Sequence, residues 1–135
     1  MSVYSISKAI EKKLAALSPV LATAYENVSF IPVVGTPYQD VRIIPANPDN
    51  SSIGGKHYIE LGFVQIMVCY PAGNGKKLAQ ERAQAIKAHL KRGTAMVEDS
   101  ISVIIIRTPT VGGAFNEGDW YKVPVSIYYQ ADIFI

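Results

Sequence analysis

Two histidines and a single cysteine are the side chains of this sequence best suited to catalysis near neutral pH. His89 lies among lysines and arginines, with no carboxylate close by in the sequence to orient its ring, and His57 follows a Gly-Gly-Lys turn at the start of a predicted strand. Cys69 stands in the middle of an apolar segment, where a buried and unreactive thiol is expected. These positions define no set of nucleophile, base and orienting group, so the sequence predicts no catalytic residue and no enzymatic activity.

The segment Tyr70–Lys77 (YPAGNGKK) is the nearest that the sequence comes to a phosphate-binding loop, because it is rich in glycine and precedes a predicted helix. A P-loop requires a glycine five positions before its Gly-Lys pair and a serine or threonine directly after that pair. This sequence has Tyr70 and Lys77 at those two positions. We therefore interpret the segment as a turn in which Asn74 caps the helix, and we expect no nucleotide or other cofactor.

Several carboxylates in turns are conceivable ligands of a metal ion. They are Asp49, Glu98, Asp99, Glu117 and Asp119. No spacing such as that of an EF-hand loop connects them, so they are interpreted as solvated side chains. One cysteine and two histidines do not suffice for a closed zinc site, and a lone cysteine forms no intramolecular disulfide. The sequence predicts no metal site.

The chain has 135 residues, of which 49% are hydrophobic and 18% charged, with a net charge of +2. This length fits a single domain covering residues 1–135, whose core is large enough to be stable without disulfides. The net charge is too small to indicate a dedicated nucleic-acid-binding protein. No apolar run approaches the roughly 18 residues of a membrane helix, and Met1–Lys8 lacks the apolar stretch of a secretory signal, so a soluble cytoplasmic protein is expected.

Two amphipathic helices are predicted. The apolar stripe of the first consists of Val3, Ile6, Ile10, Leu14 and Leu17. Ser5 is its expected N-cap, and the helix ends before Pro19, which disfavours helical backbone at the residue preceding it. The second helix is predicted over residues 76–92 and ends at Gly93, with basic residues near its C-terminus, where the helix dipole favours them.

Four strands are predicted, over residues 38–44, 57–70, 101–107 and 121–133. In the second strand the apolar phase changes beside Gly62, which predicts a β-bulge or, alternatively, a strand whose centre is buried on both faces. The run Ile104–Ile106 indicates burial on both faces and hence a central third strand. Pro124 in the fourth strand is best placed at an edge. Apolar and polar residues alternate poorly over residues 24–35, so the sequence does not decide whether this early part of the chain forms an additional short strand.

The order of these elements predicts an α+β fold. The strand–helix–strand unit favours a parallel pair, whereas the other connections favour antiparallel neighbours. We expect a mixed, mainly antiparallel sheet of four to five strands with the two helices packed on one face. Two long loops rich in glycine, proline and polar residues, 45–56 and 108–119, connect the strands.

Charge is distributed unevenly between the helices and the remainder of the chain. Three lysines against one glutamate give the first helix +2, and six basic residues against one glutamate give the second +5, so the remainder carries −5. The basic residues of these two helix faces include Lys12, Lys13, Lys76, Lys77, Arg82, Lys87, Lys91 and Arg92. They are either solvated faces balanced by acidic turns, or a basic surface that meets the acidic surface of another copy of the chain.

Several short strings along the whole chain match a known family. They are Ala24–Val28, Gly35–Tyr38, Pro45–Asn50, Tyr70–Gly75, Arg92–Thr94, Val123–Ile127 and Tyr129–Asp132. On these strings the sequence resembles a phage and prophage family of unknown function, which in turn is similar to the tail terminator proteins of phages with long, non-contractile tails (siphoviruses).

This resemblance implies a structural virion protein at the head-proximal end of the tail, assembled in the host cytoplasm. Its copies would form a homohexameric ring that caps the tail tube and stops its polymerisation. Its partners would be the tail tube protein, a head-completion or connector protein, and double-stranded DNA passing transiently through the pore. The resemblance implies no catalysis, no small-molecule substrate and no membrane partner. Two alternatives are a head–tail connector of the neck region and a small DNA-binding module that uses the basic helix faces.

The two long loops combine apolar anchors with polar residues, a composition typical of interfaces. The candidate partner or ring-interface residues are Asp49, Asn50, Ile53, Lys56, Phe115, Asn116, Glu117 and Trp120. The alternative is that the aromatic side chains pack back on their own domain, Trp120 foremost among them.

Overall fold

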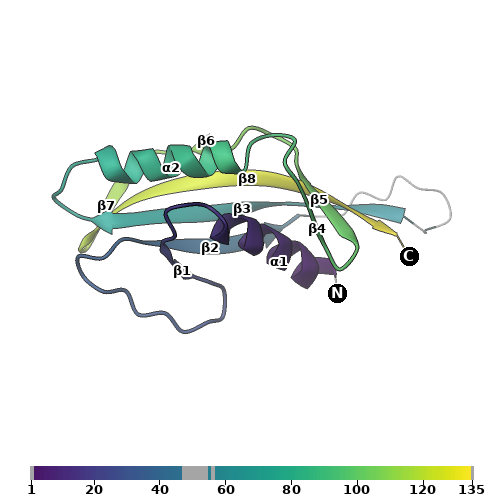
Figure 1. The fold of residues 1–135 in the computed structure, drawn as a ribbon, viewed down its shortest axis with the longest axis horizontal. Helices are drawn as coiled ribbons and strands as arrows, with labels where there is room; N and C mark the ends of the chain where they lie inside the picture. The colour runs from purple at the N-terminus through teal and green to yellow at the C-terminus, as the bar shows by residue number, and fades with distance from the viewer. Residues whose placement is uncertain (1, 47–54, 56, 135) are drawn as a thin grey trace.

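The computed structural model describes residues 2–46, 55 and 57–134 (Figure 1). Its elements follow in the order α1 (Ser2–Ala15), β1 (Ala22–Ala24), β2 (Tyr38–Pro45), β3 (His57–Pro71), α2 (Lys77–His89), β4 (Ala95–Glu98), β5 (Ile101–Ile105), β6 (Thr110–Val111), β7 (Phe115–Glu117) and β8 (Trp120–Phe134). The α+β class is confirmed, and both predicted helices and all four predicted strands are present. Neither helix is long and apolar enough to cross a membrane.

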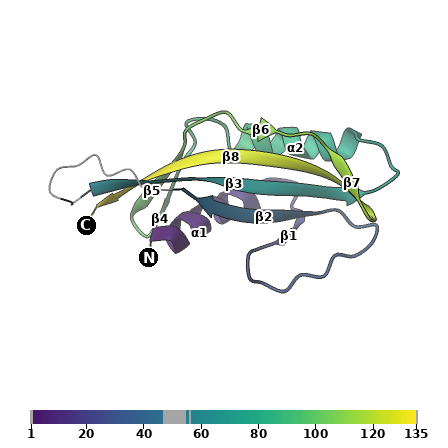
Figure 2. The ribbon, with the colours of Figure 1, turned by 180° about the vertical axis from the view of Figure 1, so that it is seen from behind.

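The sheet is built around β3 and β8, each 15 residues long, which form the extended ribbon at the centre of Figures 1 and 2. They pair antiparallel along their whole length, from His57 opposite Phe134 to Pro71 opposite Trp120. The main strand order is β1-β2-β3-β8-β5-β4, and β6 and β7 pair with β8 along the edge that β5 also uses. Only β1 and β2 are parallel, so the sheet is mixed and mainly antiparallel.

The expected number of four to five strands is wrong, because six strands form the main order and two short ones join β8. The additional strands β1, β4, β6 and β7 have only two to four residues each. A segment this short cannot display an alternating pattern of apolar residues. Its pairing with a longer strand determines its conformation.

The hydrophobic core lies between one face of the sheet and the two helices. Side chains alternate between the faces of a strand, so every second residue of β3 and β8 turns to this core. The residues that these strands contribute to the core cluster are Val64, Ile66, Val68, Val123, Val125, Ile127, Tyr129, Ala131 and Ile133. The helices contribute Ile6, Ala9, Ile10, Leu14, Ala79, Ala83 and Ile86 to the same cluster.

The helix ends differ from the predicted ones. Ser5 is not an N-cap: it lies inside α1, is buried, and its Oγ donates to Oδ2 of Asp99 at 2.7 Å, which joins the helix to the β4–β5 turn. Asn74 does not cap α2, because the N-cap residue is Lys76 and no side chain bonds the first turn. Helix α2 also ends at His89, three residues before the predicted end.

The predicted β-bulge beside Gly62 is absent, because β3 keeps one register with β2 and with β8 throughout. Gly62 lies opposite Tyr129 on the core face, and the Tyr129 ring occupies the space where a Cβ of residue 62 would be. The apolar residues at odd positions, such as Phe63, turn to the other face, where Phe63 packs against Tyr128 with ring centroids 5.6 Å apart. The change in the apolar pattern of β3 therefore arises because both faces of this strand carry apolar residues. The face opposite the core is half-buried.

Two further strand predictions are corrected by the sheet. Ile104 is not buried on both sides of β5: it is 38% exposed on the face opposite the core. Pro124 lies within the central strand β8 and not in an edge strand. Its carbonyl accepts from the Gly112 N–H at 2.8 Å. The N–H and C=O of one residue point to the same side of an antiparallel strand, so the missing N–H faces β6 and costs β3 no hydrogen bond.

Replacing Gly62 with alanine tests this close approach. The new Cβ would lie 2.5 Å from Oη of Tyr129 and 2.7 Å from the Ile44 carbonyl oxygen. We expect the free energy of unfolding, measured by urea denaturation, to fall by about 1–3 kcal/mol. Gly113→Ala is the matched control, because nothing lies within 4 Å of its Cβ position, and a change below about 0.5 kcal/mol is expected there. Equal effects of the two substitutions would contradict this account.

Candidate functional site

The structure places the residues considered for catalysis far apart in the fold. His57 is the first residue of β3. Its Nε2 lies 3.3 Å from Oδ1 of Asp132, and its ring stacks on the Phe134 ring with centroids 4.7 Å apart. His89 donates from Nε2 to the main-chain oxygen of Lys13 at 2.6 Å and thereby joins the ends of the two helices. Cys69 is buried, as predicted, and burial raises the pKa of its thiol. No group of three or more His, Cys, Asp and Glu side chains gathers among the described residues.

The interface residues predicted in the two long loops have different outcomes. Asp49, Asn50, Ile53 and Lys56 lie outside the described residues. The other predictions fall on β7 and the start of β8. Phe115, Asn116 and Glu117 are exposed, and Glu117 forms an ion pair with Lys122 at 2.8 Å.

Trp120 packs on its own domain, which was the alternative reading of this residue. Its ring meets the Tyr38 ring edge-on, with centroids 4.9 Å apart. The Tyr38 ring in turn lies beside the Phe30 ring, with centroids 5.2 Å apart. This aromatic cluster (Phe30, Tyr38 and Trp120) covers one end of the sheet on the face opposite the core. Burial, together with a hydrogen bond to Cys69, raises the pKa of the Tyr38 hydroxyl.

The basic helix faces are only partly as predicted. Lys76, Lys77, Lys91 and Arg92 are exposed, whereas Lys13 and Lys87 are half-buried. Lys12 is exposed and pairs with Glu98 at 2.9 Å. Arg82 does not belong to a basic surface, because its side chain is buried inside the domain.

Arg82 is 4% exposed and serves as an internal connector. Its guanidinium donates to the main-chain oxygen of Pro19 and, at 3.2 Å, to the side-chain oxygen of Gln39. A guanidinium can satisfy several acceptors at once, which explains why arginine is tolerated here. Burial lowers the pKa of this guanidinium. The residue holds α2, the segment before β1, and β2 together.

The segment between β1 and β2, residues 25–37, presents an apolar surface that the sequence pattern did not identify. Figures 1 and 2 show it as a long loop that projects from the edge of the sheet. Ile31 is 87% exposed and Val34 is 72% exposed, and Val28 and Val33 are exposed as well. The signal available in the sequence was the run Ile-Pro-Val-Val, which has no alternation and yet lies in a segment with turn residues at both ends. Exposed apolar groups close together in one loop are typical of interaction surfaces.

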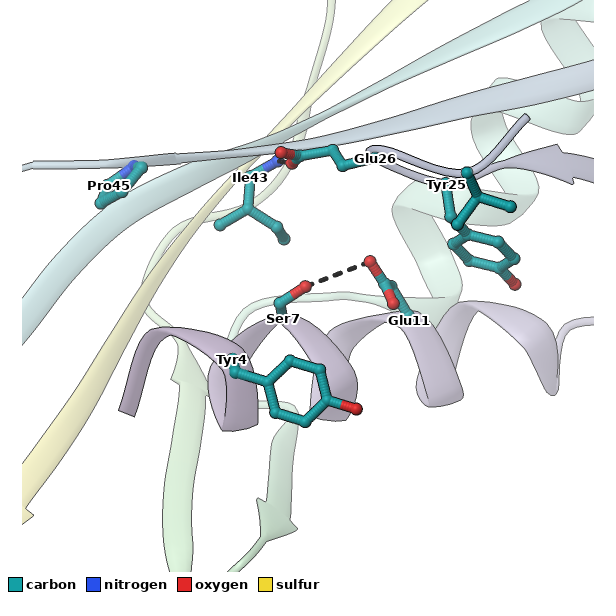
Figure 3. Close-up of a pocket in the computed structure, with 8 residues that line it drawn as sticks. Tyr4, Ser7, Glu11, Tyr25, Glu26, Ile43 and Pro45 are labelled. Carbon is teal, nitrogen blue, oxygen red and sulfur yellow. Dashed lines mark hydrogen bonds between the residues drawn. The ribbon is translucent and has the colours of Figure 1, made fainter. Parts of the chain in front are cut away.

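A groove lies beside this loop, between α1 and β2, and Figure 3 shows it from the side. It has a volume of about 670 Å³ and is lined by Tyr4, Ser7, Glu11, Tyr25, Glu26, Val28, Ile43 and Pro45. Most of this lining is apolar. Two carboxylates, those of Glu11 and Glu26, stand among the apolar groups on opposite sides of the groove.

The two carboxylates give the groove an unbalanced negative charge. Glu11 accepts from Oγ of Ser7 at 3.1 Å, and Glu26 accepts from the main-chain N–H of Ile43. Burial, and the nearby charge of Glu26, raise the pKa of the Glu11 carboxyl. Among residues 2–46, 55 and 57–134, no basic side chain lies within 4 Å of either carboxylate. The groove thus suits an apolar group that carries a positive charge beside it.

The start of α2 has the opposite character. Leu78 is 62% exposed, and the exposed Lys76 and Lys77 directly precede it. The first turn of the helix contains no acidic residue and receives no side-chain cap. A smaller cavity of about 200 Å³ separates Leu78 from Gly35 and Pro37 of the projecting loop. This end of the molecule is therefore apolar and basic.

The family model of phage tail terminator proteins matches residues 5–129, which run from α1 into the second half of β8. The chain belongs to the phage tail terminator family. This confirms the resemblance found in the sequence, and it makes the chain a structural protein of a phage tail and a component of the virion. No curated protein matches the sequence.

Two solved structures share the fold of this tail terminator. One has a TM-score of 0.77 and 22% sequence identity, and the alignment covers 99% of this chain and 95% of that chain. The other belongs to the virion of a native gene transfer agent (GTA) particle, with a TM-score of 0.65, 17% identity, and coverage of 98% and 97%. At these identities the likeness concerns the fold alone.

Replacing Arg82 with alanine tests its role inside the terminator. The main-chain oxygen of Pro19 and the buried side-chain oxygen of Gln39 would lose their donor, so we expect the free energy of unfolding to fall by about 2–4 kcal/mol in urea denaturation at pH 7. Lys91→Ala, which removes an exposed charge just beyond the same helix, is expected to change it by less than about 0.5 kcal/mol. An Arg82 variant as stable as the Lys91 variant would contradict the internal role.

Proposed function

We propose that copies of this chain form a homohexameric ring that caps the completed tail tube, stops its polymerisation and offers a surface for joining the head. The family match over residues 5–129 carries this proposal, since it covers both helices and most of the central strand β8. The ring would lie at the head-proximal end of the tail, between the tube protein and a head-completion or connector protein.

The surfaces of the chain support a role based on assembly. A ring of identical subunits needs two different surfaces on each subunit, because a head-to-tail contact joins unlike faces. The acidic groove beside α1 and the basic start of α2 differ in charge and lie on different elements. The exposed residues of the projecting loop 25–37 form a further surface for a partner above or below the ring. The proposed role involves no catalysis.

Growth of tail tubes in the presence of the protein tests the capping role. We expect purified chain added to polymerising tube protein to bind one end of each tube and to halt elongation, because a ring seated on the last tube layer hides the surface on which the next layer would form. Electron microscopy measures the tube lengths, and tubes grown without the chain are the control. A chain that neither binds tube ends nor changes tube length, and stays monomeric in both settings, would refute the proposal.

DNA affinity separates the ring from a dedicated DNA-binding module. DNA that only passes through a pore needs weak contacts with basic residues such as Lys91 and Arg92. We expect a Kd for duplex DNA no tighter than about 10⁻⁶ M at physiological salt, with the affinity falling further as salt increases. Fluorescence anisotropy over a salt series measures this, and a Kd in the nanomolar range would favour the DNA-binding module instead.

A further inference from the structure

The acidic groove has a feature that a solitary subunit does not explain. Glu11 and Glu26 line the same apolar cavity, where partial burial and the charge of Glu26 both disfavour the charged form of Glu11. Tyr4 and Val28 at its rim are each more than half exposed. A positively charged and apolar group seated in the groove would pair with the carboxylates and cover the exposed apolar rim.

The start of α2 has the complementary feature. The N-terminal end of a helix carries partial positive charge, so acidic residues stabilise it and basic residues do not. This helix nevertheless begins with Lys76 and Lys77, without a cap or an acidic residue in its first turn. Leu78 next to them adds an apolar side chain that is 62% exposed. An external partner with carboxylates and an apolar surface would offset this arrangement.

We infer that the groove of one copy receives the start of α2, Lys76–Leu78, of the neighbouring copy. This rests on the proposed ring and specifies its subunit contact. The lysines pair with Glu11 and Glu26, and Leu78 lies against Tyr4 and Val28. Figure 1 shows that the start of α2 and helix α1 lie at different places along the sheet, so the contact joins unlike surfaces and can repeat from copy to copy.

Two other exposed surfaces of the described chain fit the groove less well. Residues 29–37 of the projecting loop contain no charged side chain, so Ile31 and Val34 would leave the two carboxylates unpaired. Lys91 and Arg92 lie just past the C-terminal end of α2, where positive charge already suits the helix dipole. Of these three surfaces, the start of α2 therefore fits the charges of the groove best.

A charge exchange tests the contact. Glu11→Lys places a positive charge in the groove, and Lys76→Glu or Lys77→Glu places a negative charge at the start of α2. We expect each single variant to raise the concentration needed for half-assembly at least about tenfold. Glu11→Lys combined with one of the two lysine variants restores opposite charges at every contact of the ring, and at least one of the two combinations should recover wild-type assembly. Lys91→Glu is the control of equal charge change and should assemble as the wild type does.

Folding can be separated from assembly in these variants. A lysine at position 11 meets Glu26 across the groove, and an acidic residue at position 76 or 77 suits the helix dipole, so each monomer should keep its melting temperature. Sedimentation velocity and electron microscopy, with the chain alone and on tail tubes, measure assembly.

The outcomes distinguish this contact from the proposed function. If the wild-type chain forms no ring alone or on tubes, the ring itself is refuted. If the wild type forms rings and the single variants form them at the same concentration, only the contact is refuted. The same holds if the single variants lose the ring and neither combination restores it. Single variants that form rings but no longer bind tubes would assign these charges to the tube protein and would likewise overturn the contact between copies.

Discussion

The antiparallel pairing of β3 with β8 is the interaction around which the rest of the sheet is built. These strands share 15 residue pairs in one unbroken register, and each neighbouring strand is defined by the stretch of this ribbon that it joins. Because side chains alternate along both strands, the single register also decides which residues enter the core and which face the other side. Gly62 maintains that register, since only a residue without a side chain leaves room for the buried ring of Tyr129. The same burial raises the pKa of Tyr129 to about 12.

The parts of the fold that the sequence predicted are those with a long, repeated pattern. The two helices and the strands β2, β3 and β8 have apolar residues at regular spacing, β5 has a continuous apolar run, and all of them are present. The parts that it missed depend on contacts between distant residues. Ser5 is buried against Asp99, Arg82 bonds Pro19 and Gln39, and β4 forms by pairing with β5. Each looks locally like a cap, a surface charge or a loop, and only the tertiary structure gives it another role.

The candidate surfaces, too, were predictable only where the sequence pattern alone reveals them. The uneven charge of the helices was visible in the sequence, but the sequence could not show that Arg82 turns inward while Lys76 and Lys77 stay exposed. The groove could not be predicted either, because its two carboxylates come from α1 and from the segment after β1 and meet only in the folded chain. The family match explains why such surfaces matter: a structural protein of a phage tail acts through the shape and charge of what it presents to its neighbours.

The aromatic cluster has a consequence for the loop between β1 and β2. Phe30 is fastened to Tyr38 in the middle of that loop, while Ile31, Val33 and Val34 directly beyond it remain in solvent. Anchoring at one ring restricts the backbone of the residues that follow. The loop is thus partly preorganised, and less conformational entropy would be lost when its apolar tip is covered. A flexible segment of the same composition would lose more conformational entropy on binding, so Phe30 would support the affinity of this tip through the backbone that it anchors.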